Sequence, residues 1–412
     1  IERITAPDMV YIPLLQHAGA TCEPVVKAGD KVKVGQKIGD SKAAVSAFVH
    51  SSVSGEVIAV EQRIHPLLPF HVNTVVIKNN KQDEQDLSVC AKGTLSSITK
   101  ENIISAIKEA GVVGMGGAQF PTHIKLSSSK PIDTVLLNGC ECEPLLNADY
   151  RLMLERPETV ITGLKLLMKA SDVAKGIIAV EDNKPDAIEI LKAKSAGDSS
   201  IEIVTVKTKY PEGAERMLIK RVLGREVPLG GLPLDVGVIV NNISTAQAVY
   251  EAVYSGMPLV KRVLTVAGNG VTLQGNYEVP VGMLVSDIIK ICGIVISGNF
   301  ELKMGGAIMG FTQNNYDVPV IKGTSGIVVF QKKDDLTEEP CIKCGRCVNV
   351  CPMELKPHKL VFYAKAENWD KMEKTGVMNC IECGCCEDIC SSKSHMVSIF
   401  KKSKKIIRER KK

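Results

Sequence analysis

The chain has 412 residues, of which 45% are apolar and 24% charged, and its formal net charge is +5. These proportions are ordinary for soluble globular proteins and exclude a disordered chain, and the length predicts about three domains. No apolar stretch approaches the ~20 residues of a membrane helix, and no basic face interleaved with aromatic residues suggests a nucleic-acid partner.

Residues 1–85 are predicted to form a β-rich domain of the barrel-sandwich kind. Short runs of Val and Ile alternate with Gly-Asp turns, as in residues 25–38 and 54–60, which is typical of a small β-sandwich. The pattern resembles biotinyl and lipoyl carrier domains, in which a lysine at a hairpin tip is modified. Lys42 lacks the usual setting for that modification, so we expect a structural module.

Residues 86–255 alternate between strand and helix patterns, which predicts an α/β domain. Thr99 is expected to cap a helix. The expected helices cover 100–110, 148–154, 158–169, 185–193 and 212–222, and the expected strands cover 135–137, 177–180, 201–206 and 238–240. Ligands of such domains bind at the carboxyl ends of the strands.

A glycine-rich loop, residues 111–125, follows the first of these helices. Four glycines within seven residues let backbone N–H groups approach a phosphate or a flat ring, and Lys125 supplies a cation. The loop follows a helix and lacks a Gly-Lys-Ser/Thr ending, so it fits neither the Rossmann fingerprint nor the P-loop. A nucleotide-binding loop and a flexible turn both stay open on this pattern alone.

Polar side chains follow three of the predicted strands. They are Asn138, Glu141 and Glu143 after the first, Glu212 and Glu215 after the third, and Asn241, Asn242 and Thr245 after the last. Paired carboxylates at this edge can hold ribose hydroxyls or a nicotinamide amide, and paired amides can satisfy the edge of a flavin ring. The alternative is that the asparagines cap the next helix and the first two glutamates are solvated.

The remaining segments complete the expected domain order. Residues 256–330 return to a β-rich pattern with a short helix over 285–291, and residues 331–400 are expected to form a helical domain that contains most of the cysteines. Residues 401–412 carry eight Lys or Arg against one Glu. We expect a solvated, poorly ordered basic tail, and the alternative is a contact with an acidic protein or an anionic lipid surface.

Eight of the fourteen cysteines form two runs with the spacing C-x2-C-x2-C-x3-C. In two-cluster proteins with this spacing, three thiolates of a run bind one [4Fe–4S] cluster and the fourth crosses to the other. We therefore assign Cys341, Cys344, Cys347 and Cys390 to one cluster, and Cys380, Cys383, Cys386 and Cys351 to the other. Zinc is the alternative, but it would leave four cysteines without a role. Cys385 is interpreted as a packed residue.

Together, the glycine loop, the run from Asn138 to Glu155 and the twin cysteine runs resemble one family. They are similar to the RnfC proteins of Rnf complexes, which are ion-translocating ferredoxin:NAD+ oxidoreductases. The middle of the chain is more distantly similar to the flavoprotein subunit of respiratory complex I. The departures are Met115, where complex I has arginine, and Gln119, where it has glycine.

The resemblance implies a non-covalent FMN, an NAD(H) site and a β-grasp fold for residues 256–330. The FMN residues it implies are Gly114, Gly116, Gly117, Lys125, Asn138, Asn241, Asn242 and Thr245, and those facing NADH are Phe120, Glu143, Glu212 and Glu215. Because the chemistry belongs to the cofactors, no catalytic acid, base or nucleophile is expected.

The resemblance also implies the setting of the chain. We expect a peripheral subunit at the cytoplasmic face of the cell membrane, with membrane-embedded subunits and a ferredoxin-accepting iron–sulfur subunit as partners. FMN would exchange hydride with NAD(H) and pass single electrons to the two [4Fe–4S] clusters. The alternatives are a cobalamin reductase of a microcompartment and a non-catalytic two-cluster electron relay.

Overall fold

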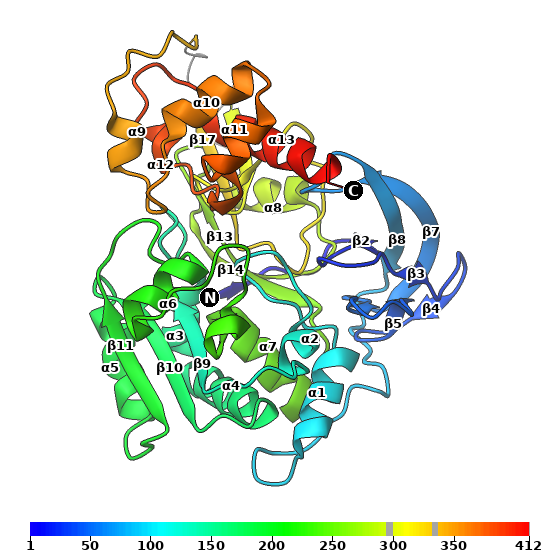
Figure 1. Ribbon diagram of the computed structural model, residues 1–412. Coiled ribbons are helices and arrows are strands. Elements are labelled where there is room, and N and C mark those ends of the chain that lie inside the picture. Colours follow the sequence, from blue (N-terminus) through cyan, green and yellow to red (C-terminus); the bar gives the residue numbers. More distant parts are fainter. Residues whose placement is uncertain (294–299, 332–336, 412) are drawn as a thin grey trace.

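The structure, a computed structural model, describes residues 1–293, 300–331 and 337–411 (Figure 1). Within these residues the chain forms four sheets and a separate group of short helices. Among the described helices, none combines the length and the apolar character that crossing a membrane requires.

The N-terminal strands form two small antiparallel sheets with the orders β2-β8-β7-β4 and β3-β5-β6. Val and Ile side chains that alternate along these strands are buried between the sheets, as the sequence pattern predicts. The strands are β2 Met9–Pro13, β3 Glu23–Pro24, β4 Lys31–Val32, β5 Lys37–Asp40, β6 Val49–His50, β7 Gly55–Ile64 and β8 His71–Asn79.

The central part is a parallel sheet of order β11-β10-β9-β12 with helices on both faces. Successive residues of its strands alternate between the two apolar clusters, which explains their continuous hydrophobic runs. The elements are α1 Lys100–Glu109, α2 Thr122–Leu126, β9 Thr134–Gly139, α3 Ala148–Glu155, α4 Pro157–Ala170, β10 Lys175–Glu181, α5 Pro185–Lys194, β11 Ile201–Val206, α6 Glu215–Leu223, η1 Pro233–Val236, β12 Val238–Asn242 and α7 Ile243–Tyr254.

The expected strands of this part are confirmed, and so are its helices except for the start of α6. Thr99 caps α1, since its hydroxyl accepts the backbone N–H of Asn102. Helix α6 begins at Glu215 and not at residue 212. A Cβ on Gly213 would lie 2.5 Å from the carbonyl oxygen of Cys140. The preceding turn therefore packs tightly against the exit of β9, and the helix starts only after it.

The third part is a mixed sheet of order β1-β14-β13-β17-β15-β16, with α8 packed on it. Its first strand comes from the chain start, because Glu2 pairs with Tyr277 of β14; the sequence pattern had placed these residues with the barrel. The elements are β1 Glu2–Arg3, β13 Lys261–Ala267, β14 Gly275–Pro280, α8 Val285–Cys292, β15 Phe300–Met304, β16 Phe311–Gln313 and β17 Gly326–Gln331.

The cysteine runs lie in a group of helices at one end of the molecule (Figure 1). These are α9 Arg346–Asn349, α10 Pro357–Lys365, α11 Trp369–Lys374, η2 Val377–Asn379, α12 Cys385–Asp388 and α13 Met396–Glu409. The start expected at 331 adjoins residues 332–336, which lie outside the described residues.

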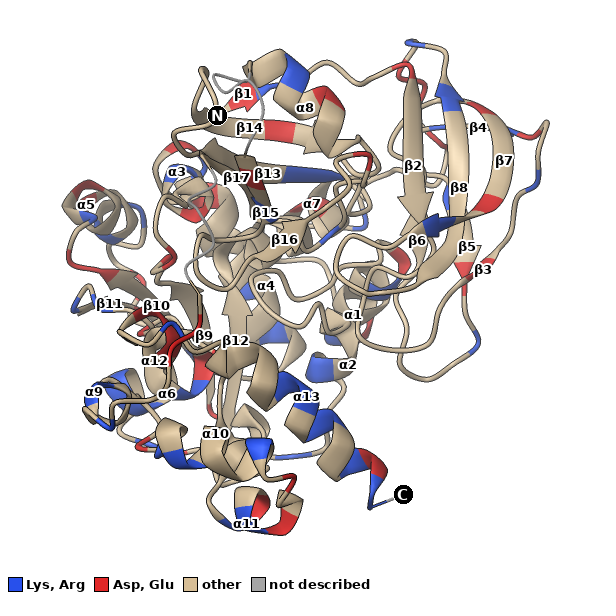
Figure 2. Cartoon of the chain, turned by 90° about the horizontal axis from the view of Figure 1, so that it is seen from above, with Lys and Arg blue, Asp and Glu red and all other residues tan. Residues whose placement is uncertain are grey.

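The prediction of a poorly ordered basic tail was wrong, because α13 continues to Glu409 (Figure 2). Phe400 and Ile407 are spaced to share one helical face, and both are buried in the helix group. Lys404 is also buried, and its Nζ donates to the carbonyl oxygen of Cys380 at 2.5 Å. Two apolar residues among the basic ones therefore fix this segment.

Lys322 joins three parts of the molecule. It follows the third sheet's α8 region, and its buried Nζ donates to the carbonyl oxygens of Phe48 in the barrel at 2.5 Å and of Gly111 in the glycine loop at 2.7 Å. Burial lowers the pKa of Lys322 to about 7, against an ordinary value of 10.5. The folded protein therefore binds this proton less readily than the unfolded chain.

We expect Lys322→Met to flatten the pH dependence of stability above pH 7. Between pH 7 and 10.5 the unfolded chain holds the proton and the folded chain does not, so the free energy of unfolding rises with pH by up to ~1.4 kcal/mol per unit. Urea unfolding of the apoprotein between about pH 7 and 9.5 measures the slope. Lys192→Met, at an exposed lysine of α5, is the control, and equal slopes in all three proteins would contradict the expectation.

Candidate functional site

The glycine-rich loop lies at the carboxyl edge of the parallel sheet. The N–H of Gly114 donates to the carbonyl oxygen of Phe120 at 2.8 Å, and the N–H of Met115 donates to Thr245 Oγ1 at 2.9 Å. Gly116 has φ +80°, and a Cβ there would lie 3.1 Å from Asn242 Nδ2. These contacts hold one side of the loop against the junction of β12 and α7.

Gly117 differs from its neighbours in facing open space. A Cβ built on it would meet no atom within 4 Å among the described residues, and the residue is exposed. Its backbone conformation is one that any residue can adopt, since its φ is not in the left-handed region. The absence of a side chain at this position is therefore not required by the packing of the loop.

Lys125 brings a cation to the same edge. Its Nζ donates to the carbonyl oxygen of Val240 in β12 at 3.1 Å. Burial lowers the pKa of Lys125, and the negative charge of Glu215 opposes that shift. The loop, the end of β12 and the start of α6 therefore converge on one region, as expected from their places after the strands.

The two asparagines at the end of β12 differ in their contacts. Asn242 caps α7, since its Oδ1 accepts the N–H of Ser244 at 2.8 Å. Asn241 is 3% exposed, and neither atom of its amide has a hydrogen-bond partner among the described residues. An unsatisfied buried amide costs ~1–3 kcal/mol. An external polar group at this position would remove that cost, which fits a bound flavin.

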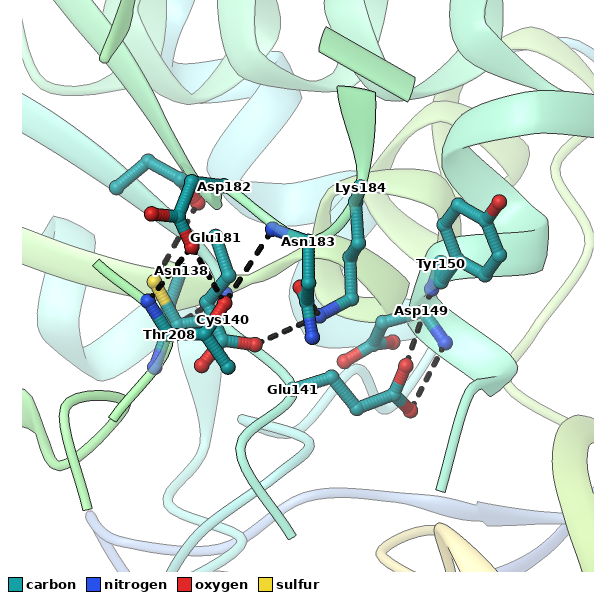
Figure 3. Close-up of polar contacts among 11 residues, drawn as sticks. Asn138, Cys140, Glu141, Asp149, Tyr150, Glu181, Asp182, Asn183, Lys184 and Thr208 are labelled. Carbon is teal, nitrogen blue, oxygen red and sulfur yellow. Dashed lines mark hydrogen bonds and ion pairs between the residues drawn. The ribbon is translucent and has the colours of Figure 1, made fainter. Parts of the chain in front are cut away.

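Glu141 serves the start of α3 (Figure 3). Its two carboxylate oxygens accept the N–H groups of Asp149 and Tyr150 at 3.2 and 3.1 Å. Burial raises the pKa of Glu141 to about 8, and the charge of Asp149 adds to the shift. Neither the solvated alternative nor a free ribose-binding carboxylate matches these contacts.

Glu143 is engaged by a second loop. Its Oε2 accepts the N–H of Ile308 and its Oε1 accepts the N–H of Met309, each at 2.9 Å. A Cβ on Gly306 would lie 2.1 Å from Glu143 Oε2, so this loop closes directly over the carboxylate. Glu143 thus ties the exit of β9 to the turn between β15 and β16.

The turn before α6 also reaches the exit of β9. Asn138 Nδ2 donates to the carbonyl oxygen of Gly213 at 2.8 Å. Glu212 is buried and accepts the Nε of Arg221 at 2.5 Å, whereas Glu215 is exposed at the first turn of α6. Phe120 is half-buried in the glycine loop. Of the four residues expected to face NADH, only Glu215 carries a carboxylate free of these protein contacts.

Two residues that the sequence patterns did not single out support the glycine loop. Asp149 accepts from Asn242 Nδ2 at 2.5 Å and from Ser244 Oγ at 2.7 Å. Arg262 of β13 is buried beneath the loop, where its guanidinium contacts Met115 Sδ. Burial lowers the pKa of Arg262 to about 10, and the charge of Asp149 opposes that shift. The signal was a lone arginine in an apolar strand.

A buried ion pair at the end of β10 was missed as well. Lys184 Nζ and Glu181 Oε2 are 2.6 Å apart, and both side chains are nearly inaccessible to solvent (Figure 3). Next to it, Thr208 donates to Asp182 at 2.7 Å and joins the ends of β10 and β11. Only the spacing of opposite charges directly after a predicted strand could have indicated this pair.

The structure brings the cluster cysteines together in two groups. Burial raises the pKa of Cys347, and the charges of Cys341, Cys344 and Cys390 add to the shift. Burial raises the pKa of Cys386 to about 12, with smaller effects from Cys380, Cys383, Cys351 and Cys347. Each group contains the fourth cysteine of the other run. The grouping fits the crossed assignment, although cluster ligation itself stays a prediction.

The surroundings of the thiols suit iron–sulfur ligation. The N–H of Leu355 donates to Cys351 Sγ at 3.4 Å, and the N–H of Glu382 donates to Cys380 Sγ at 3.3 Å. Hydrogen bonds to sulfur are one means of setting a cluster potential. In the part of the chain that the structure describes, no three His, Cys, Asp or Glu side chains are arranged to hold a single metal ion.

Three protein-family models match the chain in the order of its parts. The RnfC barrel sandwich hybrid domain matches residues 1–82, the Nuo51 FMN-binding domain matches residues 107–251, and the 4Fe-4S dicluster domain matches residues 340–395. The expected fold class is confirmed, and the cofactors implied by the matched domains are FMN and [4Fe–4S] clusters.

Curated relatives match nearly the whole chain. The RnfC-type component of the Na(+)-translocating ferredoxin:NAD(+) oxidoreductase complex of Acetobacterium woodii is 45% identical, over 98% of this chain and 93% of the relative. Its counterpart in the proton-translocating complex of Clostridium ljungdahlii is 43% identical, over 87% and 79%. A solved NAD+-reducing [NiFe]-hydrogenase chain is 21% identical with a TM-score of 0.49, over 67% and 52%. The chain therefore belongs to the RnfC family of ion-translocating ferredoxin:NAD(+) oxidoreductase complexes.

Proposed function

We propose that this chain is the NAD(H)-linked electron-transfer subunit of a ferredoxin:NAD+ oxidoreductase complex. Its relatives carry that activity in their names, and its central and C-terminal domains match FMN-binding and dicluster models. The observation that carries the proposal is the unsatisfied Asn241 amide beside the glycine loop, because it calls for a polar ligand where the family model expects FMN.

The residues proposed to hold FMN surround the carboxyl edge of the parallel sheet. Gly116 and Gly117 let the loop backbone approach the cofactor, Lys125 offers a cation for its phosphate, and Asn241 offers an amide donor and acceptor. Thr245 acts indirectly by holding the N–H of Met115. When bound, FMN accepts hydride in one step and releases electrons singly, which no side chain can do.

For NAD(H), we propose Phe120 and Glu215 as the contacts nearest to the open side of the loop. Glu143 and Glu212 are occupied by protein hydrogen bonds in this structure. They would reach the nucleotide only by giving up those bonds, so we assign them a supporting role in shaping the site. Glu141, which is held at α3, is assigned to positioning as well.

The partners and location follow from the family. We propose membrane-embedded subunits and a ferredoxin-accepting iron–sulfur subunit as partners, with the chain at the cytoplasmic face of the membrane. Since no described helix can cross a bilayer, the translocated ion would pass through the partner subunits. The chain would supply only the NAD(H)-linked end of the electron path.

Anaerobic reconstitution with iron, sulfide and FMN, followed by NADH, tests this function. We expect flavin bleaching and then cluster signals by electron paramagnetic resonance, with about eight irons per chain. A chain that binds clusters but no FMN would be a two-cluster relay. Reduction of a corrinoid without assembly into a membrane complex would favour the cobalamin reductase.

Asn241→Leu is expected to separate FMN binding from stability. Removing a buried amide that lacks partners should keep the apoprotein as stable as wild type or raise its stability by ~1 kcal/mol, while FMN binds about tenfold more weakly. Urea unfolding and FMN titration measure the two effects. Asn102→Leu, at an exposed position of α1, is the control. A destabilised apoprotein with unchanged FMN affinity would contradict the assignment.

A further inference from the structure

Tyr210 connects the proposed flavin site to one of the two cysteine runs. Its hydroxyl donates to the carbonyl oxygen of Cys383 at 2.6 Å and lies 3.4 Å from Glu143 Oε1. Burial raises the pKa of Tyr210, with the charge of Glu143 as the next cause, so the hydroxyl keeps its proton. A phenol has one proton to donate, and the shorter contact shows that Cys383 receives it.

The residues around Tyr210 hold the same two regions together. Its turn is tied to β9, because Asn138 donates to Gly213. The loop that binds Glu143 also reaches the cysteine run, since a Cβ on Gly384 would lie 2.8 Å from Ile308 Cγ2. The exit of β9, the turn before α6 and residues 305–310 therefore form one continuous support beneath Cys383.

The two cysteine runs differ in their exposure. Cys383 and Cys386 are each 8% exposed and face this support, whereas Cys341, Cys344 and the residues between them lie at the surface. Ile342, between those two cysteines, is 69% exposed. The second run thus lies on the flavin side and the first run on the outer side of the helix group.

We propose that Tyr210 is a positioning residue that holds the second-run loop, Cys380–Cys386, against the flavin site, so that the second-run cluster exchanges electrons with FMN. The first-run cluster then faces the outside and serves the partner. This inference rests on the proposed function. Reduced flavin loses two electrons and one proton to return to FMN, and the second-run cluster accepts those electrons one at a time.

Tyr210→Phe tests the positioning role without relying on activity. Losing the hydrogen bond to Cys383 should raise amide hydrogen exchange in residues 380–386 by about 3- to 10-fold. Tyr277→Phe is the matched control, because the Tyr277 hydroxyl donates to a backbone carbonyl, that of Leu273, far from the cysteine runs. Exchange in the Tyr210→Phe protein that equals wild type would overturn the positioning role.

Paired cysteine variants test the order of the clusters. Cys341→Ala/Cys344→Ala and Cys380→Ala/Cys383→Ala should each retain FMN and about four irons per chain, which shows that each has folded. We expect NADH to reduce the remaining cluster at least ~10-fold faster in the first variant than in the second, because only the second-run cluster lies beside the flavin. Rapid freezing and electron paramagnetic resonance follow the signal.

The outcomes separate this inference from the function on which it rests. If NADH fails to bleach the flavin of the wild-type protein, the proposed function falls, while the exchange experiment still judges Tyr210. If NADH bleaches the flavin in every variant and reduces the first-run cluster equally fast without the second, only the proposed order is overturned.

Discussion

Gly117→Val is expected to abolish FMN retention during purification while leaving the apoprotein as stable as wild type. The added side chain would extend into the open space in front of the loop, where no described atom lies within 4 Å of the Cβ position. Exposed substitutions of this kind change the free energy of unfolding by no more than ~0.5 kcal/mol. A ligand pressed against the loop would instead meet the valine, and such overpacking weakens binding ~10- to 100-fold.

The neighbouring glycine gives the contrasting case. At Gly116, the φ of +80° and the approach to Asn242 predict a less stable apoprotein for any larger residue. Ala44→Val, at an exposed site in the barrel, controls for the added bulk alone. FMN fluorescence titration and urea unfolding measure both properties. Normal FMN affinity in the Gly117→Val protein would place the cofactor away from this loop.

The parallel sheet and its helices were predictable because their signals are local. Continuous apolar runs marked β9, β10 and β12, and Thr99 marked the start of α1. The early part of α6 was not predictable, since its start depends on the packing of Gly213 against Cys140, which lies far earlier in the chain. The pairing of Glu2 with β14 has the same origin.

The candidate site shows the same division. Residue type and position after a strand were enough to indicate Asn241, but only the fold shows that its amide is unsatisfied and that the Asn242 amide caps α7. Composition suggested a disordered basic end, whereas Phe400 and Ile407 anchor it. Arg262 reaches the glycine loop from another sheet, a contact that no spacing within the loop could indicate.

Double cysteine variants should distinguish crossed from uncrossed cluster ligation by iron content alone. If Cys351 belongs with the second run, Cys351→Ala/Cys380→Ala removes ligands of a single cluster and leaves about four irons per chain. Cys351→Ala/Cys341→Ala would then damage both clusters and leave close to none. Uncrossed ligation predicts the reverse pair of results. The grouping of Cys351 with Cys386 favours the crossed outcome, and its physical consequence is that each run holds both clusters, so neither loop can move without the other.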